Sequence, residues 1–251
     1  MGLGIERTHD GAMLCLTLDA APANVLDAEM IDEITAAVND ADDRVMAIVF
    51  DHAGKHFSFG ASVPEHTAAE APGMLKRFHA LFRLLAEKAI PTAAIVRGRC
   101  LGGGLELASY CTWVVASPAA KLGQPEIKLA VFPPMASFVL PWRLGAGHAM
   151  DLCVSGRTVD AEEAERMGLV TAIADDPRRW FEDFFDTHLK PGSASSLRMA
   201  ERAVRAPLTD ALETRLPALE RLYLDELMST HDANEGIRAF MAKEKPVYEH
   251  R

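Results

Sequence analysis

The sequence predicts an α/β fold for this chain of 251 residues. Short apolar segments of strand length alternate with longer segments whose apolar residues recur at helical spacing. Glycines and prolines fall between these segments, where turns are expected. A chain of this length can bury a sizeable core. We therefore expect one main domain with an appended part, rather than two equal domains.

Three segments are the expected strands. Residues 14–18 are flanked by turn-forming residues and begin the predicted sheet. Residues 45–50 form a continuous apolar run, which suits a sheet that is covered on both faces. Residues 92–96 supply another buried strand. Strands of this kind, alternating with helices, indicate an α/β core.

Helical periodicity appears between these strands. Residues 27–40 place their apolar side chains on one face, and Asp27 is the expected N-cap. A longer amphipathic helix is expected over residues 73–88, ended by Pro91. A further helix opens at residues 105–109, directly after a run of glycines.

The pattern becomes mostly helical from about Glu162, and Pro191-Gly192 is the natural seam. We expect a core containing the active site over residues 1–191 and a helical region over residues 192–251. The helical region could pack on its own core or on another subunit.

Composition excludes several classes of partner. The net charge of -10 disfavours nucleic acids and anionic membranes, which need a cationic surface. No apolar run approaches the roughly 20 residues that span a bilayer, and the N-terminus has no export pattern. The four cysteines show no metal-binding spacing and are expected to be reduced core residues of a cytoplasmic protein. We therefore expect no nucleic acid, no membrane and no metal.

The strongest local signal is the glycine run Gly102-Gly103-Gly104, which lies between a predicted strand and a predicted helix. Glycines allow backbone N–H groups to approach a ligand oxygen, as in an oxyanion or phosphate site. A tight connection without a ligand explains the glycines equally well. Glu106 follows in the first turn of the helix, where it either caps the helix or faces a pocket.

A second carboxylate, Glu126, follows Pro125 in an otherwise apolar stretch, which makes simple solvation less expected. Taken alone, it could equally be structural. The loop at residues 54–62 follows a predicted strand and could present another backbone donor.

These motifs together resemble the crotonase superfamily, also called the enoyl-CoA hydratase/isomerase family. The resemblance covers nearly the whole chain, and the motifs that carry it are residues 22–26, 57–62, 101–108, 123–126, 164–170 and 235–240. It implies a spiral of strand-strand-helix repeats, with residues 192–251 as a helical trimerisation region. It also implies a homotrimer or a dimer of trimers.

The resemblance assigns roles to individual residues. The backbone N–H groups of Ala61 and Gly103 would form an oxyanion hole for a thioester carbonyl, and Glu106 and Glu126 would be the two catalytic glutamates. Coenzyme A would be part of the substrate, with no permanently bound cofactor. The implied coenzyme A and substrate contacts are Ala23, Lys55, Phe57, Phe59, Gly60, Ser62, Val63, Pro64, Gly102, Phe132 and Pro133.

Two features depart from the common family pattern. Ser62 stands where many hydratases have an aspartate, and Pro133-Pro134 replaces a glycine-rich loop. Phe59, Phe132 and Met135 would add an apolar wall suited to a ring or a compact acyl group. The histidines His56 and His66 could reach the site, although loop histidines usually have no catalytic duty.

Residues 57–66 are similar to the alicyclic dienoyl-CoA hydratases, which act on cyclohexa-1,5-diene-1-carbonyl-CoA. A hydratase of that substrate is one expectation, and a general 2-enoyl-CoA hydratase is its competitor. An isomerase or thioester hydrolase would use the same oxyanion hole with one glutamate. A non-catalytic acyl-CoA-binding scaffold is the remaining alternative.

Overall fold

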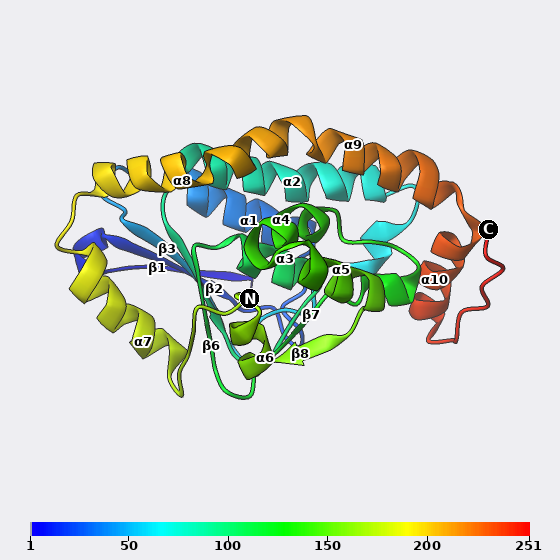
Figure 1. The fold of residues 1–251 in the computed structure, drawn as a ribbon, viewed down its shortest axis with the longest axis horizontal. Helices are drawn as coiled ribbons and strands as arrows, with labels where there is room; N and C mark the ends of the chain where they lie inside the picture. Colours follow the sequence, from blue (N-terminus) through cyan, green and yellow to red (C-terminus); the bar gives the residue numbers. More distant parts are fainter. Residues whose placement is uncertain (1) are drawn as a thin grey trace.

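Two sheets of unequal size organise the protein (Figure 1). The computed structural model describes residues 2–251. The larger sheet has the order β1 (Leu3–Thr8), β2 (Met13–Leu18), β3 (Ala47–His52), β4 (Thr92–Val96), β6 (Trp113–Ala116) and β9 (Ala172–Ile173). The smaller sheet has the order β5 (Arg99–Leu101), β7 (Lys121–Gly123) and β8 (Thr158–Asp160).

Parallel pairing dominates the larger sheet. β1 runs antiparallel to β2, and every following pair from β2 to β9 is parallel. Leu16 pairs with Phe50, and Ile95 pairs with Val115. β3 and β4 are buried along their whole length, as continuous apolar runs predict.

The chain repeats one sequence of elements. It passes from β4 of the larger sheet to β5 of the smaller sheet and into helix α3 (Gly103–Tyr110). It then passes from β6 to β7 and into the 3-10 helix η3 (Glu126–Leu129). This strand-strand-helix repeat confirms the predicted spiral, and both repeats end at a helix that carries one of the two glutamates.

Helices cover the sheets and form the C-terminal third. Those that precede the seam at residue 191 are η1 (His9–Gly11), α1 (Ala28–Asn39), η2 (Val63–His66), α2 (Ala71–Lys88), α4 (Pro134–Leu144), α5 (Ala146–Ser155), α6 (Ala161–Arg166), α7 (Pro177–Phe184) and η4 (Phe185–Leu189). Those that follow are α8 (Ala194–Thr214), α9 (Leu216–Arg221), η5 (Leu222–Glu226), η6 (Leu227–Ser229) and α10 (His231–Ala242). In Figure 1, α8 and α9 run across the top of α2.

The predicted helix boundaries hold with small shifts. Asp27 caps α1 by accepting a hydrogen bond from the Met30 amide at 3.0 Å. α2 ends at Lys88, as predicted, and Ala89 closes it in a left-handed conformation with φ of 49°. β1 was not predicted, since most of its side chains are exposed and leave no apolar pattern. β9 lies inside a region that was expected to be mostly helical.

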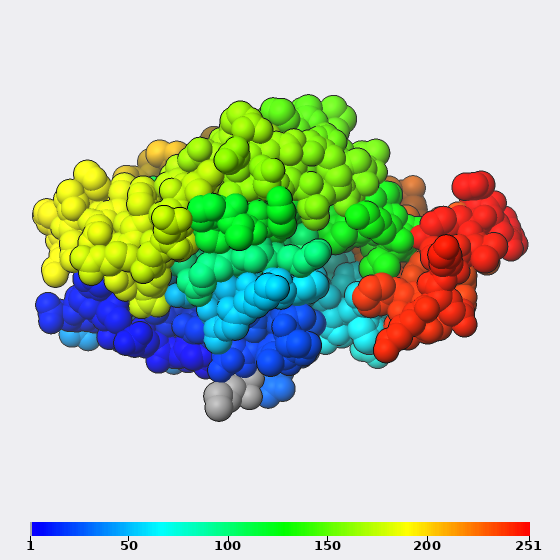
Figure 2. All heavy atoms as spheres, turned by 90° about the horizontal axis from the view of Figure 1, so that it is seen from below, coloured from blue at the N-terminus to red at the C-terminus, as the bar shows by residue number. Residues whose placement is uncertain are grey.

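The C-terminal helices pack on the core of the sheets. Leu208, Leu212 and Leu216 belong to the same buried cluster as the strand residues Leu16 and Phe50. α10 packs against η2 and η3, and Figure 2 shows this C-terminal part at one end of the molecule. The helices α8 and α9 therefore share the main core, whereas η5, η6 and α10 belong to a smaller apolar cluster with the start of α2.

Arg143 in α4 anchors the end of α3. Its Nη1 donates to the carbonyls of Ser109 at 3.1 Å and Cys111 at 2.6 Å, and its Nε donates to Leu169 at 3.1 Å. Replacing Arg143→Met leaves buried carbonyls without a donor, so we expect the free energy of unfolding to fall by about 2–4 kcal/mol. Denaturant unfolding followed by circular dichroism measures this loss.

The matched control is Arg179→Met. Arg179 forms an exposed i,i+4 ion pair with Asp183 in α7, so its loss should cost less than about 1 kcal/mol. Equal costs for the two variants would contradict the anchoring role of Arg143.

Candidate active site

A cavity of about 750 Å³ lies beside the glycine turn. This volume is within the range of small-molecule sites, which are mostly apolar with a few converging polar groups. Five segments of the core line it: the loop with Ala23 and Val25, the loop leading into η2, the first half of α2, the turn before α3, and η3 with the loop that follows. η5 and the C-terminal segment complete the wall.

The glycine turn has a geometry that requires glycine. Gly102 has φ of 52° and ψ of -130°, a conformation that side-chain-bearing residues avoid. A Cβ on Gly102 would lie 2.7 Å from Oε1 of Glu126, and one on Gly104 would lie 2.6 Å from Cβ of Ser58. The turn therefore brings the start of α3 against both neighbouring segments.

Two backbone N–H groups meet at this turn. A Cβ on Gly103 would lie 3.0 Å from the amide nitrogen of Ala61, so the two residues are in close contact. Within residues 2–251, neither amide donates a hydrogen bond to a protein acceptor. Both residues line the cavity. A ligand oxygen at this position could accept from both amides, as in an oxyanion hole.

Glu106 points away from its own helix N-terminus. Its Oε1 accepts from the amide of Ala136, in the first turn of α4, at 2.8 Å. The residue is 5% exposed. Burial raises the pKa of Glu106 to about 7, against the opposing effect of hydrogen bonds from the Ala136 and Met135 amides. Capping of α3, one alternative from the sequence, is therefore not its role.

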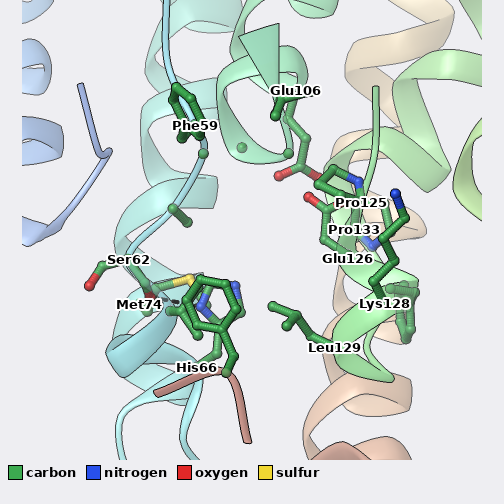
Figure 3. A pocket seen from close by; sticks show the side chains of 18 of the residues that line it. Phe59, Ser62, His66, Met74, Glu106, Pro125, Glu126, Lys128, Leu129 and Pro133 are labelled. Atoms are coloured by element: carbon green, nitrogen blue, oxygen red, sulfur yellow. Dashed lines mark hydrogen bonds between the residues drawn. The ribbon is translucent and has the colours of Figure 1, made fainter. Parts of the chain in front are cut away.

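Glu126 begins η3 and lies against the glycine turn, with Oε1 2.7 Å from the position of a Cβ on Gly102. Gln124 is fully buried beside Glu126. When the side-chain amide nitrogen of Gln124 faces the carboxylate, it donates to Oε1 at 3.1 Å and to Oε2 at 3.0 Å. Burial, followed by repulsion from Glu106, raises the pKa of Glu126 well above its usual range. Figure 3 shows the two carboxylates directed toward the same space. Such a pair retains a shared proton near neutral pH.

Most of the residues implied by the resemblance lie on this cavity. Besides the glutamates and the two amides, its lining includes Ala23, Phe59, Gly60, Ser62, Val63, Pro64, Gly102, Phe132 and Pro133. His66 also lines it, with Nδ1 2.8 Å from the carbonyl of Ser62.

Three expected contacts lie elsewhere. The side chain of Phe57 is fully buried in the main core, edge-on to His52, so it does not face the cavity. Lys55 is exposed in its loop and is not part of the lining. Met135 is buried in the core and does not add to the apolar wall. Lys55 and Phe57 show that neighbouring residues of an irregular segment point in different directions, whereas Met135 lies in α4 on the face that packs on the core.

Sequence reasoning missed the wall formed by distant elements. Met74, Leu75, Phe78 and His79 of α2 line the cavity, as does Tyr223 of η5. The C-terminal segment adds Gly236, Phe240, Glu244 and Pro246. The apolar periodicity of α2 indicated a buried face, but nothing in it indicated that part of that face lines a cavity.

The described part of the chain shows neither a metal-binding cluster nor a membrane-spanning helix. Residues 2–251 contain no group of three or more histidine, cysteine, aspartate or glutamate side chains placed to hold a metal ion. No helix in the same range is long and apolar enough to cross a membrane.

Comparisons with known proteins agree with this fold. The sequence model of the enoyl-CoA hydratase/isomerase family matches residues 8–251. The chain is 43% identical to a cyclohexa-1,5-dienecarbonyl-CoA hydratase of Thauera aromatica, covering 99% of this chain and 97% of the relative. It is 39% identical to a probable enoyl-CoA hydratase of Rhizobium meliloti, covering 96% of each.

A solved structure shows the same architecture. The crystal structure of an enoyl-CoA hydratase from Mycobacterium avium subsp. paratuberculosis superposes with a TM-score of 0.84, at 26% identity, covering 99% of this chain and 98% of the other. The fold is thus the crotonase fold. The chain belongs to the enoyl-CoA hydratase/isomerase family, and it is an enzyme of the hydratase type.

Proposed function

We propose that this enzyme adds water to an unsaturated acyl-CoA thioester bound in the cavity, with no permanently bound cofactor. The observation that carries the proposal is the meeting, at one cavity, of two unpaired amides with two carboxylates. The amides are those of Ala61 and Gly103, and the carboxylates are those of Glu106, which is buried, and Glu126, which is half-buried. The amides would hold the thioester carbonyl, and the carboxylates would handle the water and the protons.

The chemistry follows from these groups. As water attacks the conjugated carbon, negative charge moves to the carbonyl oxygen, where two N–H donors stabilise the enolate. One glutamate accepts a proton from the attacking water, and the other returns a proton to carbon. One carboxylate and one carboxylic acid are needed, which is the state of a pair that shares one proton.

The apolar lining supports a compact cyclic acyl group. Phe59, Phe132 and Pro133 face the space from the loops, and Phe78 faces it from α2. The similarity to the Thauera aromatica hydratase supports cyclohexa-1,5-diene-1-carbonyl-CoA as substrate, with 6-hydroxycyclohex-1-ene-1-carbonyl-CoA as product. A linear 2-enoyl-CoA giving 3-hydroxyacyl-CoA is the second candidate, supported by the other hydratase relatives.

A panel of CoA esters tests this function. We expect mass analysis to show addition of one water, with oxygen from labelled solvent, and a kcat/KM for the cyclic dienoyl ester at least about tenfold above that for crotonyl-CoA. A higher value for the linear ester would overturn the cyclic substrate. Binding of the esters without labelled oxygen in any product would favour the scaffold alternative.

We also propose that residues 192–251 serve oligomerisation, in a homotrimer or a dimer of trimers in the cytoplasm. The large apolar side chains of Met199 and Val204 on α8 are exposed, which supports a covered surface there. Sedimentation analysis at micromolar concentration measures the state, and a monomer would contradict the proposal.

The rate of hydration should depend on pH through the carboxylate pair. Burial raises the pKa of Glu106 to about 7, so below that pH both carboxyls hold protons and no base remains. We therefore expect kcat/KM to rise as pH rises through about 7 and then to level off. A pH–rate profile measures this, and a profile that is flat from pH 5 to 8 would contradict it.

The contribution of Glu106 to the free energy of unfolding should fall as pH rises, whereas kcat/KM should rise. A carboxyl whose pKa is raised in the folded state, from 4.5 to about 7, stabilises the fold fully below pH 4.5 and loses that contribution as pH rises through 7. The variant Glu106→Gln lacks this titrating group. We expect its free energy of unfolding, minus that of the unaltered enzyme, to be about 1–3 kcal/mol larger at pH 8 than at pH 5. Thermal unfolding at both pH values measures the difference.

A further inference from the structure

Gln124 is a fully buried polar residue in direct contact with one of the two carboxylates. It follows β7 and precedes Pro125, the N-cap of η3. Its side chain is 0% exposed, and its amide lies within hydrogen-bond distance of both oxygens of Glu126, at 3.1 and 3.0 Å. Gln124 is not part of the cavity lining. It can therefore influence a bound ligand only through Glu126.

The amide of Gln124 can face Glu126 in two ways. A half-turn about the last side-chain torsion exchanges the amide oxygen and nitrogen, and this torsion is roughly two-fold, so torsional energy favours neither orientation. With the nitrogen forward, the amide donates to an ionised carboxylate, and with the oxygen forward it accepts from the O–H of a carboxylic acid. Each orientation therefore fits one protonation state of Glu126.

Glu126 passes through both protonation states in the proposed reaction. One glutamate takes a proton from the attacking water while the other gives a proton to carbon, so each carboxyl changes state, whichever role it has. The starting state returns when one proton passes between the two carboxyls. A buried group that loses its hydrogen-bond partner is destabilised. An amide that turns would keep Glu126 paired before and after each proton transfer.

We propose that the side-chain amide of Gln124 turns with the protonation state of Glu126, donating to the carboxylate and accepting from the acid, and so holds Glu126 in place throughout the reaction. Gln124 is then a positioning residue rather than a catalytic one. The proposal rests on the proposed function, because that function makes Glu126 exchange a proton.

The surroundings of Glu126 include three other groups that carry an ionisable proton. Glu106 faces it from α3, and the charge of Glu126 also acts on Cys153 of α5 and Tyr223 of η5. Burial raises the pKa of Cys153 to about 12 and also raises the pKa of Tyr223, so both keep their protons near neutral pH. Of these groups, the two carboxyls are left to titrate near pH 7.

The remaining polar groups of the cavity wall do not mask this titration. Burial lowers the pKa of His66 in η2 and of His79 in α2, so both are neutral near pH 7. Lys128 of η3 and Glu244, which follows α10, line the cavity but are exposed to solvent, which screens their charges. A change at Gln124 near pH 7 should therefore report the carboxyl pair.

The sequence allows a direct test, because Gln124 is the only glutamine in the chain. Glutamine labelled with ¹⁵N in its side-chain amide, incorporated by cell-free synthesis, gives the full-length enzyme a single labelled NH2 group. We expect its NMR signals to shift between pH 5 and pH 8, with the midpoint of the rise in kcat/KM, because a donor replaces an acceptor opposite Glu126.

Two variants assign this shift to one carboxyl. The shift should persist in Glu106→Met, where Glu126 still titrates, and it should disappear in Glu126→Met. Methionine is used in both so that Gln124 stays the only labelled residue. A shift that survives in Glu126→Met, or signals of the unaltered enzyme that stay constant from pH 5 to pH 8, would overturn the proposal.

Kinetics of Gln124→Met give a second readout. Methionine has a similar length but cannot serve as the amide does, so kcat should fall by about 10–100-fold while KM changes by less than about threefold. The rise of kcat/KM should move up by about 0.5–1 pH unit, because the bond to the carboxylate is about twice as strong as the bond to the acid. A merely structural glutamine would leave the position of that rise unchanged.

Ser109→Ala is the matched control. Ser109 is also 0% exposed, and its hydroxyl donates to the backbone carbonyl of Glu106 at 3.1 Å. This variant loses a buried hydrogen bond beside the site without touching either carboxylate. It should keep the kcat of the unaltered enzyme and the position of the rise in kcat/KM.

The outcomes separate the two proposals. If no CoA ester of the panel is hydrated, the proposed function fails, whatever the signals of Gln124 show. If hydration occurs but those signals ignore the protonation of Glu126, or if Gln124→Met keeps the kcat and the pH profile of the unaltered enzyme, the proposed function stands and the turning amide is wrong.

Discussion

Replacing either Glu106→Gln or Glu126→Gln should reduce kcat for hydration by about 10²–10⁴-fold, because each change removes one of two groups that move protons. Glutamine keeps the side-chain volume, and its oxygen can still accept from the Ala136 amide that Glu106 engages at 2.8 Å. KM should therefore change much less than kcat. Steady-state kinetics with purified variants measures both constants.

The double variant adds a sharper criterion. Groups that act as one unit are not additive, so the double variant should be little slower than the slower single variant. Glu162→Gln, an exposed residue in the first turn of α6, is the control and should keep normal activity. Near-normal turnover after loss of one glutamate would refute the paired mechanism and favour the isomerase or hydrolase alternative.

Gly102→Ala should lower kcat by about 10²-fold or more, because misplacement of catalytic groups by about 1 Å can have that effect. The conformation of Gly102 has positive φ, and the added Cβ would lie 2.7 Å from Oε1 of Glu126. The substitution therefore strains the turn that carries Gly103 and pushes one carboxylate out of place. We also expect a loss of about 1–3 kcal/mol in the free energy of unfolding.

Gly147→Ala controls for the substitution itself. Gly147 lies in α5, has no positive φ, and a Cβ added there meets nothing within 4 Å. It should keep full activity and gain slightly in stability, since alanine favours helices over glycine by up to about 1 kcal/mol. Unchanged activity in Gly102→Ala would show that the close approach of the turn to Glu126 is not needed for turnover.

Local patterns were sufficient for the elements with strong periodicity. The apolar runs of β3 and β4 and the amphipathic pattern of α1 and α2 predicted their type and place. β1 could not be predicted, because its pairing with β2 leaves most of its side chains in solvent and produces no apolar signal. The short β9 gains its strand conformation from pairing with β6 rather than from its own sequence.

The site shows the same division. The glycine run, Glu106 and Glu126 stand out in the sequence because glycines and carboxylates are conspicuous between apolar segments. Lys55 and Phe57 lie in an equally conspicuous loop, yet the structure turns one to solvent and the other into the core. A motif places its backbone in the fold but does not decide the direction of each side chain.

The sequence by itself determined the α/β class from its local pattern. The resemblance carried by the order of its motifs predicted the spiral, the family, and the two carboxylates and glycine turn that lie in the cavity. Only the tertiary structure decided that Glu106 hydrogen-bonds to α4 rather than capping its own helix, and that α2, η5 and the C-terminal segment close the cavity. Those contacts join residues such as His79 and Glu220, which are 141 positions apart. Apolar periodicity shows that a helix face is buried, but the partner that buries it is set by the packing of the whole chain.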